Sequence, residues 1–183
     1  MSSQQVIDKG EEKTISQNPM KTIKIGSVVL NMSVGAAEDR LNRAITVLTR
    51  LTGQKPAIRR AKKTIKEFKI RKNEPIACMV TVRGKKAEEL LNRLFEAVNR
   101  RIKSSYFTQF GNFSFGIKEY IDIPGMSYDP SIGILGMDVA VNLHRPGYRV
   151  KYRRKKSKIG KDHLITKEEA IEFIKNKFNV VVE

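Results

Sequence analysis

The sequence predicts a two-layer α+β domain in which an antiparallel sheet carries three amphipathic helices on one face. Two observations predict this class. The strand-like segments alternate apolar and polar residues instead of running continuously apolar, and each helical segment carries a single apolar stripe. Three helices can cover only the apolar face, so the other, polar face is expected to stay open for binding, with long basic loops beside it. The polar positions out of phase with the core are Asn31, Thr81, Arg83, Asp138 and Asn142.

The elements are expected in the order β, α, β, α, β, β, α. Residues 21–33 are rich in β-branched and aliphatic residues and are interrupted at Gly26, which predicts an extended segment. A helix follows, in which Glu38 and Asp39 suit the positive end and Gly53 supplies a left-handed stop. Its apolar stripe consists of Leu41, Ala44, Ile45, Leu48 and Leu51.

The next predicted elements are a half-buried strand at residues 76–82 and a second long helix after Gly84. The apolar face of this helix consists of Ala87, Leu90, Leu91, Leu94, Val98 and Ile102. Residues 104–134 are expected to form long ordered loops around one strand. The aromatic alternation of Phe113 and Phe115 within it has two interpretations: a base-stacking strand like that of an RNA-recognition motif, or a contribution to the core.

Residues 135–143 form the most regular alternation in the chain and predict a strand that ends at residues 144–147. Thr166 and Glu169 then form a capping box, because each side chain can satisfy the other residue's free amide. This box opens the last predicted helix, with Ala170, Ile171, Ile174 and Phe178 facing inward.

Charge is the strongest functional signal. The 183 residues include 36 Lys and Arg against 19 Asp and Glu, a formal net charge of +17. Residues 55–72 hold nine basic residues and one acid, residues 145–161 hold nine basic residues and no acid, and the remainder balances at 18 against 18. Such a charge costs stability by self-repulsion. Two concentrated basic segments on a neutral body therefore predict two contact surfaces for a polyphosphate.

We call residues 55–72 the first basic segment and residues 145–161 the second. The candidate contacts of the first are Arg59, Arg60, Lys62, Lys63, Lys66, Lys69, Arg71 and Lys72. Those of the second are Arg145, Arg149, Lys151, Arg153, Arg154, Lys155, Lys156 and Lys158. Phe68 in the first segment, and Tyr148 and Tyr152 in the second, could stack on bases, which favours RNA. No recognition helix carries the charge, and neither segment has an apolar face for a membrane surface.

No pattern of residues in the sequence predicts an active site, a metal site or a cofactor site. The two histidines, His144 and His163, have no Cys or carboxylate at metal-ligand spacing, and Cys78 falls on the inward phase of its strand. The alternative from another class is a nucleic-acid-processing enzyme that uses Asp138 or Asp122 with His144. Such an enzyme would need a concave pocket with clustered carboxylates and a metal. The sequence favours a binding protein over an enzyme.

Several motifs run through the chain in a fixed order: LTGQKP (51–56), AKKT (61–64), IRKNEPI (70–76), VRGKKAEE (82–89), GNFSFGI (111–117), YDPSIGI (128–134) and RPG (145–147). Together they resemble the universal large-subunit ribosomal protein five family, called eleven in eukaryotes, over about residues 19–178. The form of residues 129–134 and the basic stretch after Pro146 are similar to the archaeal and eukaryotic branch. Arg59 departs from the family pattern, which has a small hydroxyl residue or Cys there.

The resemblance implies a structural, RNA-binding protein of the central protuberance of the large subunit. Such proteins hold 5S ribosomal RNA (rRNA) against the large-subunit rRNA together with another 5S-binding ribosomal protein. The candidate cations of the second basic segment are then expected to contact rRNA. By motif position the resemblance implies 5S rRNA contacts at Asn31, Gln54, Phe68, Thr81 and Arg83. It also implies that the basic loop over residues 59–72 approaches transfer RNA (tRNA) in the peptidyl site, and that the protein contributes to a bridge with the head of the small subunit.

Residues 1–18 are polar and are expected to form a mobile tail, and residues 19–183 are expected to form a single rRNA-binding domain. No apolar run approaches the roughly 18–20 residues that a membrane span needs, and the first residues show no signal or transit pattern. A single Cys is typical of a reducing compartment. The chain is therefore expected in the cytoplasm, on the ribosome.

Overall fold

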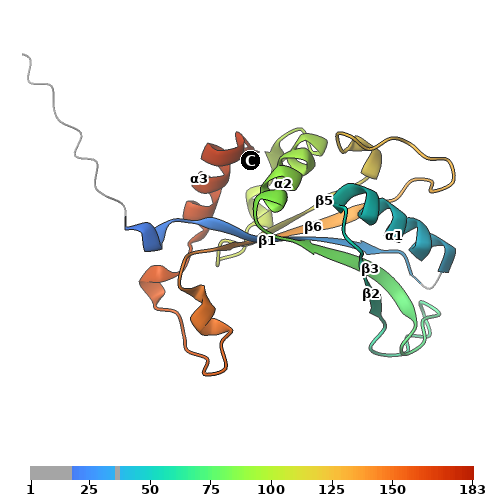
Figure 1. The fold of residues 1–183 in the computed structure, drawn as a ribbon, viewed down its shortest axis with the longest axis horizontal. Helices are drawn as coiled ribbons and strands as arrows, with labels where there is room; N and C mark the ends of the chain where they lie inside the picture. The colour runs from blue at the N-terminus through green and yellow to red at the C-terminus, as the bar shows by residue number, and fades with distance from the viewer. Residues whose placement is uncertain (1–17, 36–37) are drawn as a thin grey trace, which may run out of the picture.

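The computed structural model describes residues 18–35 and 38–183. The tail predicted over residues 1–18 lies outside the described residues except for Asn18, whose side chain accepts a hydrogen bond from the Met20 N–H. Figure 1 shows a sheet in one layer and the helices in a second layer on one side of it. This arrangement confirms the predicted two-layer α+β class.

The described residues form a five-stranded sheet in the order β2-β3-β1-β6-β5, and every neighbouring pair is antiparallel. The strands are β1 (Lys24–Ser33), β2 (Ala57–Arg60), β3 (Pro75–Val82), β5 (Phe113–Ile117) and β6 (Met137–His144). β1 lies in the centre. The predicted interruption at Gly26 is a shift in the β1–β6 register, and a Cβ there would lie 2.8 Å from Nδ1 of His144. A side chain at this position would displace the His144 ring, which is why glycine suits it.

The helices are α1 (Glu38–Thr52), α2 (Lys85–Ala97) and α3 (Lys167–Phe178), and they cover the apolar face of the sheet (Figure 1). α1 packs on β3 and α2 packs on β1. α2 and α3 are joined by an ion pair between Glu88 and Lys177 at 2.7 Å and by an edge contact between the Phe95 and Phe178 rings. The predicted stop at Gly53 and the predicted capping box of Thr166 and Glu169 are both present.

Phe113 and Phe115 belong to the core. Both side chains are buried on the helix-covered face, where their rings lie 6.3 Å and 5.7 Å from the Phe95 ring, centroid to centroid. Burying aromatic rings in offset stacks is favourable, and buried rings cannot stack on RNA bases. The structure thus supports the interpretation of this strand as part of the core and not as a base-stacking strand.

The second helix ends earlier than predicted. Asn99 and Arg100 both have a φ of 54°, a left-handed conformation that stops α2 at Ala97. Ile102, expected on the helix, lies instead in a two-residue strand, β4 (Arg101–Ile102), which pairs in parallel with β7 (Val181–Val182). Strands this short carry no periodic signal, so the sequence could not show them.

Candidate nucleic-acid interface

The face of the sheet opposite the helices carries short and mostly uncharged side chains. In its central rows Asn31 lies opposite Met79 and Asp138, and Val29 lies opposite Thr81 and Ala140. Residues directly opposite one another in an antiparallel pair point to the same face. Asn31 and Thr81 are half-buried, and the three helices lie on the other side of the sheet (Figure 1). Their amide and hydroxyl groups can donate and accept hydrogen bonds.

Three of the five residues expected to contact 5S rRNA lie on this open face. Arg83 joins Asn31 and Thr81 there, because it lines a pocket of about 470 Å³ with Ser27 and Asn142 of the same face. The structure places the other two elsewhere. Gln54 lies in the connection from α1 to β2, and Phe68 lies in the turn at the tip of the first basic segment, 69% exposed.

The first basic segment forms one arm and the tip of a hairpin that β3 completes, rather than a loop. β2 pairs with β3, the backbones of Ile65 and Ile70 form a further bridge near the tip, and the Lys72 N–H donates to the Thr64 hydroxyl at 3.0 Å. Arg59 and Arg60, predicted in the loop, therefore lie in β2. Four strand residues that are exposed on both faces leave no alternation for the sequence to reveal.

Arg59 has a place on the open face itself. It lies opposite Ala77 of β3, and its Nε is 2.9 Å from Sδ of Met79, which shares a row with Asn31. The residue that departs from the family pattern thus adds a cation to the edge of the open face. The six remaining cations of this set, Lys62, Lys63, Lys66, Lys69, Arg71 and Lys72, are exposed along the rest of the hairpin.

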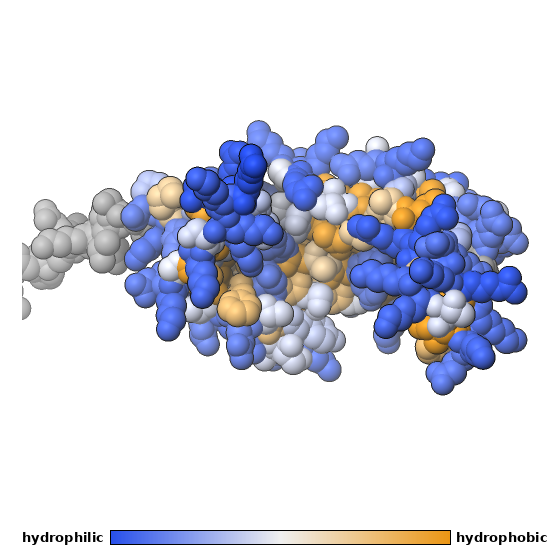
Figure 2. Space-filling model, turned by 90° about the horizontal axis from the view of Figure 1, so that it is seen from below, coloured by the Kyte–Doolittle hydropathy of each residue, from blue (hydrophilic) through white to orange (hydrophobic). Residues whose placement is uncertain are grey.

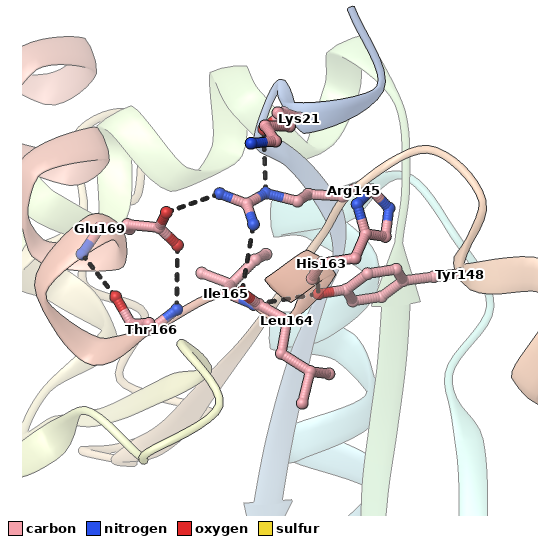
Figure 3. A network of polar contacts seen from close by, with 8 residues as sticks. All are labelled: Lys21, Arg145, Tyr148, His163, Leu164, Ile165, Thr166 and Glu169. Atoms are coloured by element: carbon pink, nitrogen blue, oxygen red, sulfur yellow. Dashed lines mark hydrogen bonds and ion pairs between the residues drawn. The ribbon is translucent and has the colours of Figure 1, made fainter. Parts of the chain in front are cut away.

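The second basic segment is held to the domain by Arg145, whose side chain is buried. Figure 3 shows its guanidinium at the centre of a polar network. It donates to the Lys21 carbonyl at 2.9 Å, to the Leu164 carbonyl at 3.1 Å and to Oε1 of Glu169 at 2.8 Å. Arg145 is therefore the exception among the cations expected to contact RNA, because its donors are bonded inside the protein.

The sequence contains a signal for this role. The inward positions of β6 are Met137, Val139, Val141 and Leu143, and two residues further along the same phase is Arg145. An arginine in the core phase of a strand must find internal acceptors, because burying an unpaired charge is costly. Its position within a run of basic residues concealed this signal.

The network also fixes the protonation of Glu169 and the position of Tyr148. Burial, the largest single influence, raises the pKa of Glu169, but the Thr166 N–H and the Arg145 guanidinium together outweigh it, so the pKa is lowered. The Tyr148 hydroxyl donates to the His163 carbonyl at 3.0 Å and accepts from the Ile165 N–H at 3.1 Å. Tyr148 is thus a packing residue rather than a free stacking platform.

The other seven candidate cations of the second segment are exposed: Arg149, Lys151, Arg153, Arg154, Lys155, Lys156 and Lys158. Both basic segments project from the side of the sheet opposite the helices, at opposite ends of the molecule (Figure 1). Figure 2 looks from that side and shows two strongly hydrophilic masses with paler and apolar atoms between them. The open face is therefore a weakly charged surface flanked by two positively charged projections. This arrangement is suited to a folded polyanion.

Comparisons with known proteins match almost the whole described chain. A family model described as ribosomal protein L5 matches residues 18–71, and one described as the C-terminus of the same ribosomal family matches residues 75–173. The relative from Sulfurisphaera tokodaii, named large ribosomal subunit protein uL5, is 52% identical over 93% of this chain and 97% of its own length. The chain belongs to the ribosomal protein L5 family. Proteins of the same name from Pyrobaculum aerophilum and Methanococcus maripaludis are 50% and 51% identical over 92% and 91% of this chain and 95% and 94% of their own lengths.

Membership of the L5 family makes the chain a structural ribosomal protein and not an enzyme. The geometry agrees. Asp138 and His144 lie six residues apart along β6, roughly 20 Å at the rise of a strand. The turn that ends in Asp122 is bonded through the Tyr120 N–H to Leu135, at the end of β6 away from His144. The sequence-based alternative of a nucleic-acid-processing enzyme is therefore wrong.

The single cysteine of this L5 protein, Cys78, is buried. Burial raises the pKa of the Cys78 thiol to about 11, so the thiol stays protonated and weakly nucleophilic at neutral pH. Within residues 18–35 and 38–183, no group of three or more His, Cys, Asp and Glu side chains is placed to hold a metal ion. In the same part of the chain, no helix is both long enough and apolar enough to cross a membrane.

Proposed function

We propose that this L5 protein is a structural component of the large ribosomal subunit that binds 5S rRNA on the open face of its sheet. The observation that carries the proposal is the uncovered polar face between two basic projections. Its relatives named as large-subunit proteins support the assignment to that subunit. The exposed cations of the second basic segment then contact the large-subunit rRNA, and the site of action is the cytoplasmic ribosome.

The proposal extends to other partners. The first basic segment carries one acid, Glu67, among its exposed cations and projects away from the core, so it can reach a second RNA while the sheet holds the first. We assign this second contact to tRNA in the peptidyl site. On the same proposal, another 5S-binding ribosomal protein and a protein of the small-subunit head meet the chain elsewhere on its surface.

Replacing Asn31 and Thr81 together with alanine is expected to weaken binding to isolated 5S rRNA. Short polar side chains on the open face would bond sugars or base edges, and each lost contact should cost about 1–2 kcal/mol. Binding is measured by filter retention or fluorescence titration. The matched control replaces Thr46 and Asn92, which are exposed on α1 and α2, with alanine and should leave affinity unchanged. Unchanged affinity in a folded double variant of the open face would place the contact elsewhere.

Replacing Arg60, Lys62, Lys63 and Lys66 with glutamine should separate the two RNA contacts. These side chains are exposed, so the free energy of unfolding should stay within about 1 kcal/mol, or rise as repulsion is relieved. Affinity for 5S rRNA should largely survive, and retention of peptidyl-site tRNA in reconstituted ribosomes should fall.

The control variant neutralises one arginine and three lysines on the helix side and α2–β5 connection, Arg43, Lys86, Lys103 and Lys175. It should retain tRNA as the wild type does. If the hairpin variant instead loses 5S rRNA as completely as the sheet variant, yet holds tRNA normally once incorporated, the hairpin is a 5S-binding element and this division of labour is incorrect.

A further inference from the structure

An open cleft of about 860 Å³ lies between the second basic segment and the turn that precedes β5. Two aromatic side chains, Phe110 and Tyr152, face it from different loops, and half-buried Ile159 and Leu164 also line it. Phe110 is 63% exposed and Tyr152 is 68% exposed. Large aromatic rings left open to water at a concave site are a typical feature of binding surfaces.

The turn that carries Phe110 is fixed in place. Thr108 bonds the Asn112 carbonyl through both its N–H and its hydroxyl, at 2.8 Å and 3.0 Å. Gly111 has a φ of +76°, and a Cβ there would lie 2.5 Å from Cγ2 of Ile165, so the turn lies directly on that core residue. The backbone that carries Phe110 is therefore already ordered, so less conformational entropy is lost when a ligand binds, which favours binding.

The loop that carries Tyr152 is anchored to the same core residue. The Tyr152 N–H donates to the Arg149 carbonyl at 3.0 Å, and the Ser157 N–H closes the loop on the Val150 carbonyl at 3.1 Å. The loop begins at Tyr148, whose hydroxyl accepts from the Ile165 N–H. The two loops that line the cleft thus both contact Ile165, and this core residue fixes the distance between them.

Charge indicates what the cleft can hold. Lys151, Lys156 and Lys158 line it, and none of its described lining residues is acidic. Nζ of Lys151 lies 6.0 Å from the centroid of the Tyr152 ring. An apolar aromatic interior with a cationic rim matches a nucleotide, whose flat base can stack on the rings while its phosphate meets the lysines.

The cleft also borders the pocket at the edge of the open face. Tyr152 lines both this cleft and the pocket that contains Arg83, Asn142 and His144 at the edge of the sheet. A strand of RNA that leaves the sheet past Arg83 would therefore reach Tyr152 next. This shared residue favours RNA over an acidic peptide as the occupant.

We propose that the cleft between Phe110 and Tyr152 binds an unstacked base of single-stranded RNA, with the adjoining phosphate held by Lys151, Lys156 and Lys158. This inference rests on the proposed RNA-binding function and names a site in addition to the sheet. Binding would use stacking, which is largely independent of base identity, together with charge.

The test uses the full chain and two ten-nucleotide probes, an oligoadenylate and the same backbone with abasic sugars. Stacking of one base should make the wild type bind the intact probe about five- to a hundred-fold more tightly than the abasic probe. Phe110→Ala should lower that ratio several-fold, and Lys156→Gln should weaken both probes equally. The matched control is Tyr128→Ala, an exposed aromatic of the loop before β6 that does not line the cleft, and it should keep the wild-type ratio.

Equal binding of the two probes by the wild type, or no binding of either, would overturn the base site. So would an unchanged ratio in Phe110→Ala, or displacement of the oligoadenylate by a glutamate peptide at lower concentration than by RNA. Affinity for 5S rRNA is measured in parallel on the same samples. Absence of the base site in a wild type that binds 5S rRNA refutes this inference alone, whereas a wild type that does not bind 5S rRNA refutes the proposed function.

Discussion

Replacing Arg145 with alanine should lower the free energy of unfolding by about 3 kcal/mol. The guanidinium bonds two backbone carbonyls and the Glu169 carboxylate, and only 6% of its side chain is exposed. Alanine would leave the Lys21 and Leu164 carbonyls without these donors and open a cavity between the turn before β1, the end of β6 and the start of α3. The measurement is urea unfolding of the RNA-free chain, with a lower midpoint at an unchanged m-value.

The control for this prediction comes from the same segment. Arg154→Ala removes an equal charge from an exposed position and should change the free energy of unfolding by no more than about 0.5 kcal/mol. Arg145→Lys should recover only part of the loss, because an ammonium cannot reproduce the planar fork of donors. If Arg145→Ala is as stable as Arg154→Ala, the network of Figure 3 does not hold the second basic segment in place.

Raising monovalent salt from about 50 to about 200 mM should weaken binding to 5S rRNA by about 250- to 1,000-fold. The estimate supposes roughly six phosphate contacts, for which log affinity against log salt slopes at about −4 to −5. The two basic segments hold eighteen basic residues, all but Arg145 exposed, so this number of contacts is available. Affinity is measured by titration at several salt concentrations.

The Asn31 and Thr81 double alanine variant is the control for the salt dependence. Neither side chain is charged, so its affinity should be lower at every salt concentration while the slope stays that of the wild type. An affinity that barely changes with salt in the wild type would make the electrostatic interpretation of the two basic segments wrong.

Elements with a strong period were predicted well from the sequence. The strand β6 and the helix α1 were placed correctly, because their patterns reflect burial on one side. The capping box of α3 was also placed correctly, because its hydrogen bonds join residues only three positions apart. β2, β4 and the early end of α2 were missed. Their formation depends on partners distant in sequence or on backbone angles at one or two residues, which leave no period.

The residues of the candidate site were likewise predicted only in part. Alternation identified Asn31 and Thr81 as open-face residues, and motif resemblance added Gln54 and Phe68, which the structure places off that face. Arg59 was assigned to a loop and lies on the sheet, where pairing with β3 brings it beside Met79. Pairing partners determine which side chains share a face, and a one-residue change of register would reverse them.

By itself the sequence determined the class of fold, the family, the two basic segments and the polar phase of the sheet, because composition, period and motif order are properties of the chain. Only the tertiary structure showed that Arg145 is buried, that both basic segments lie on the side away from the helices, and that Phe110 and Tyr152 share a cleft. These facts depend on contacts between residues far apart in the chain, such as Arg145 with Lys21 and Gly111 with Ile165. Such contacts form when the strands pair and the helices pack, and the local pattern of one element does not show which distant residue it will meet.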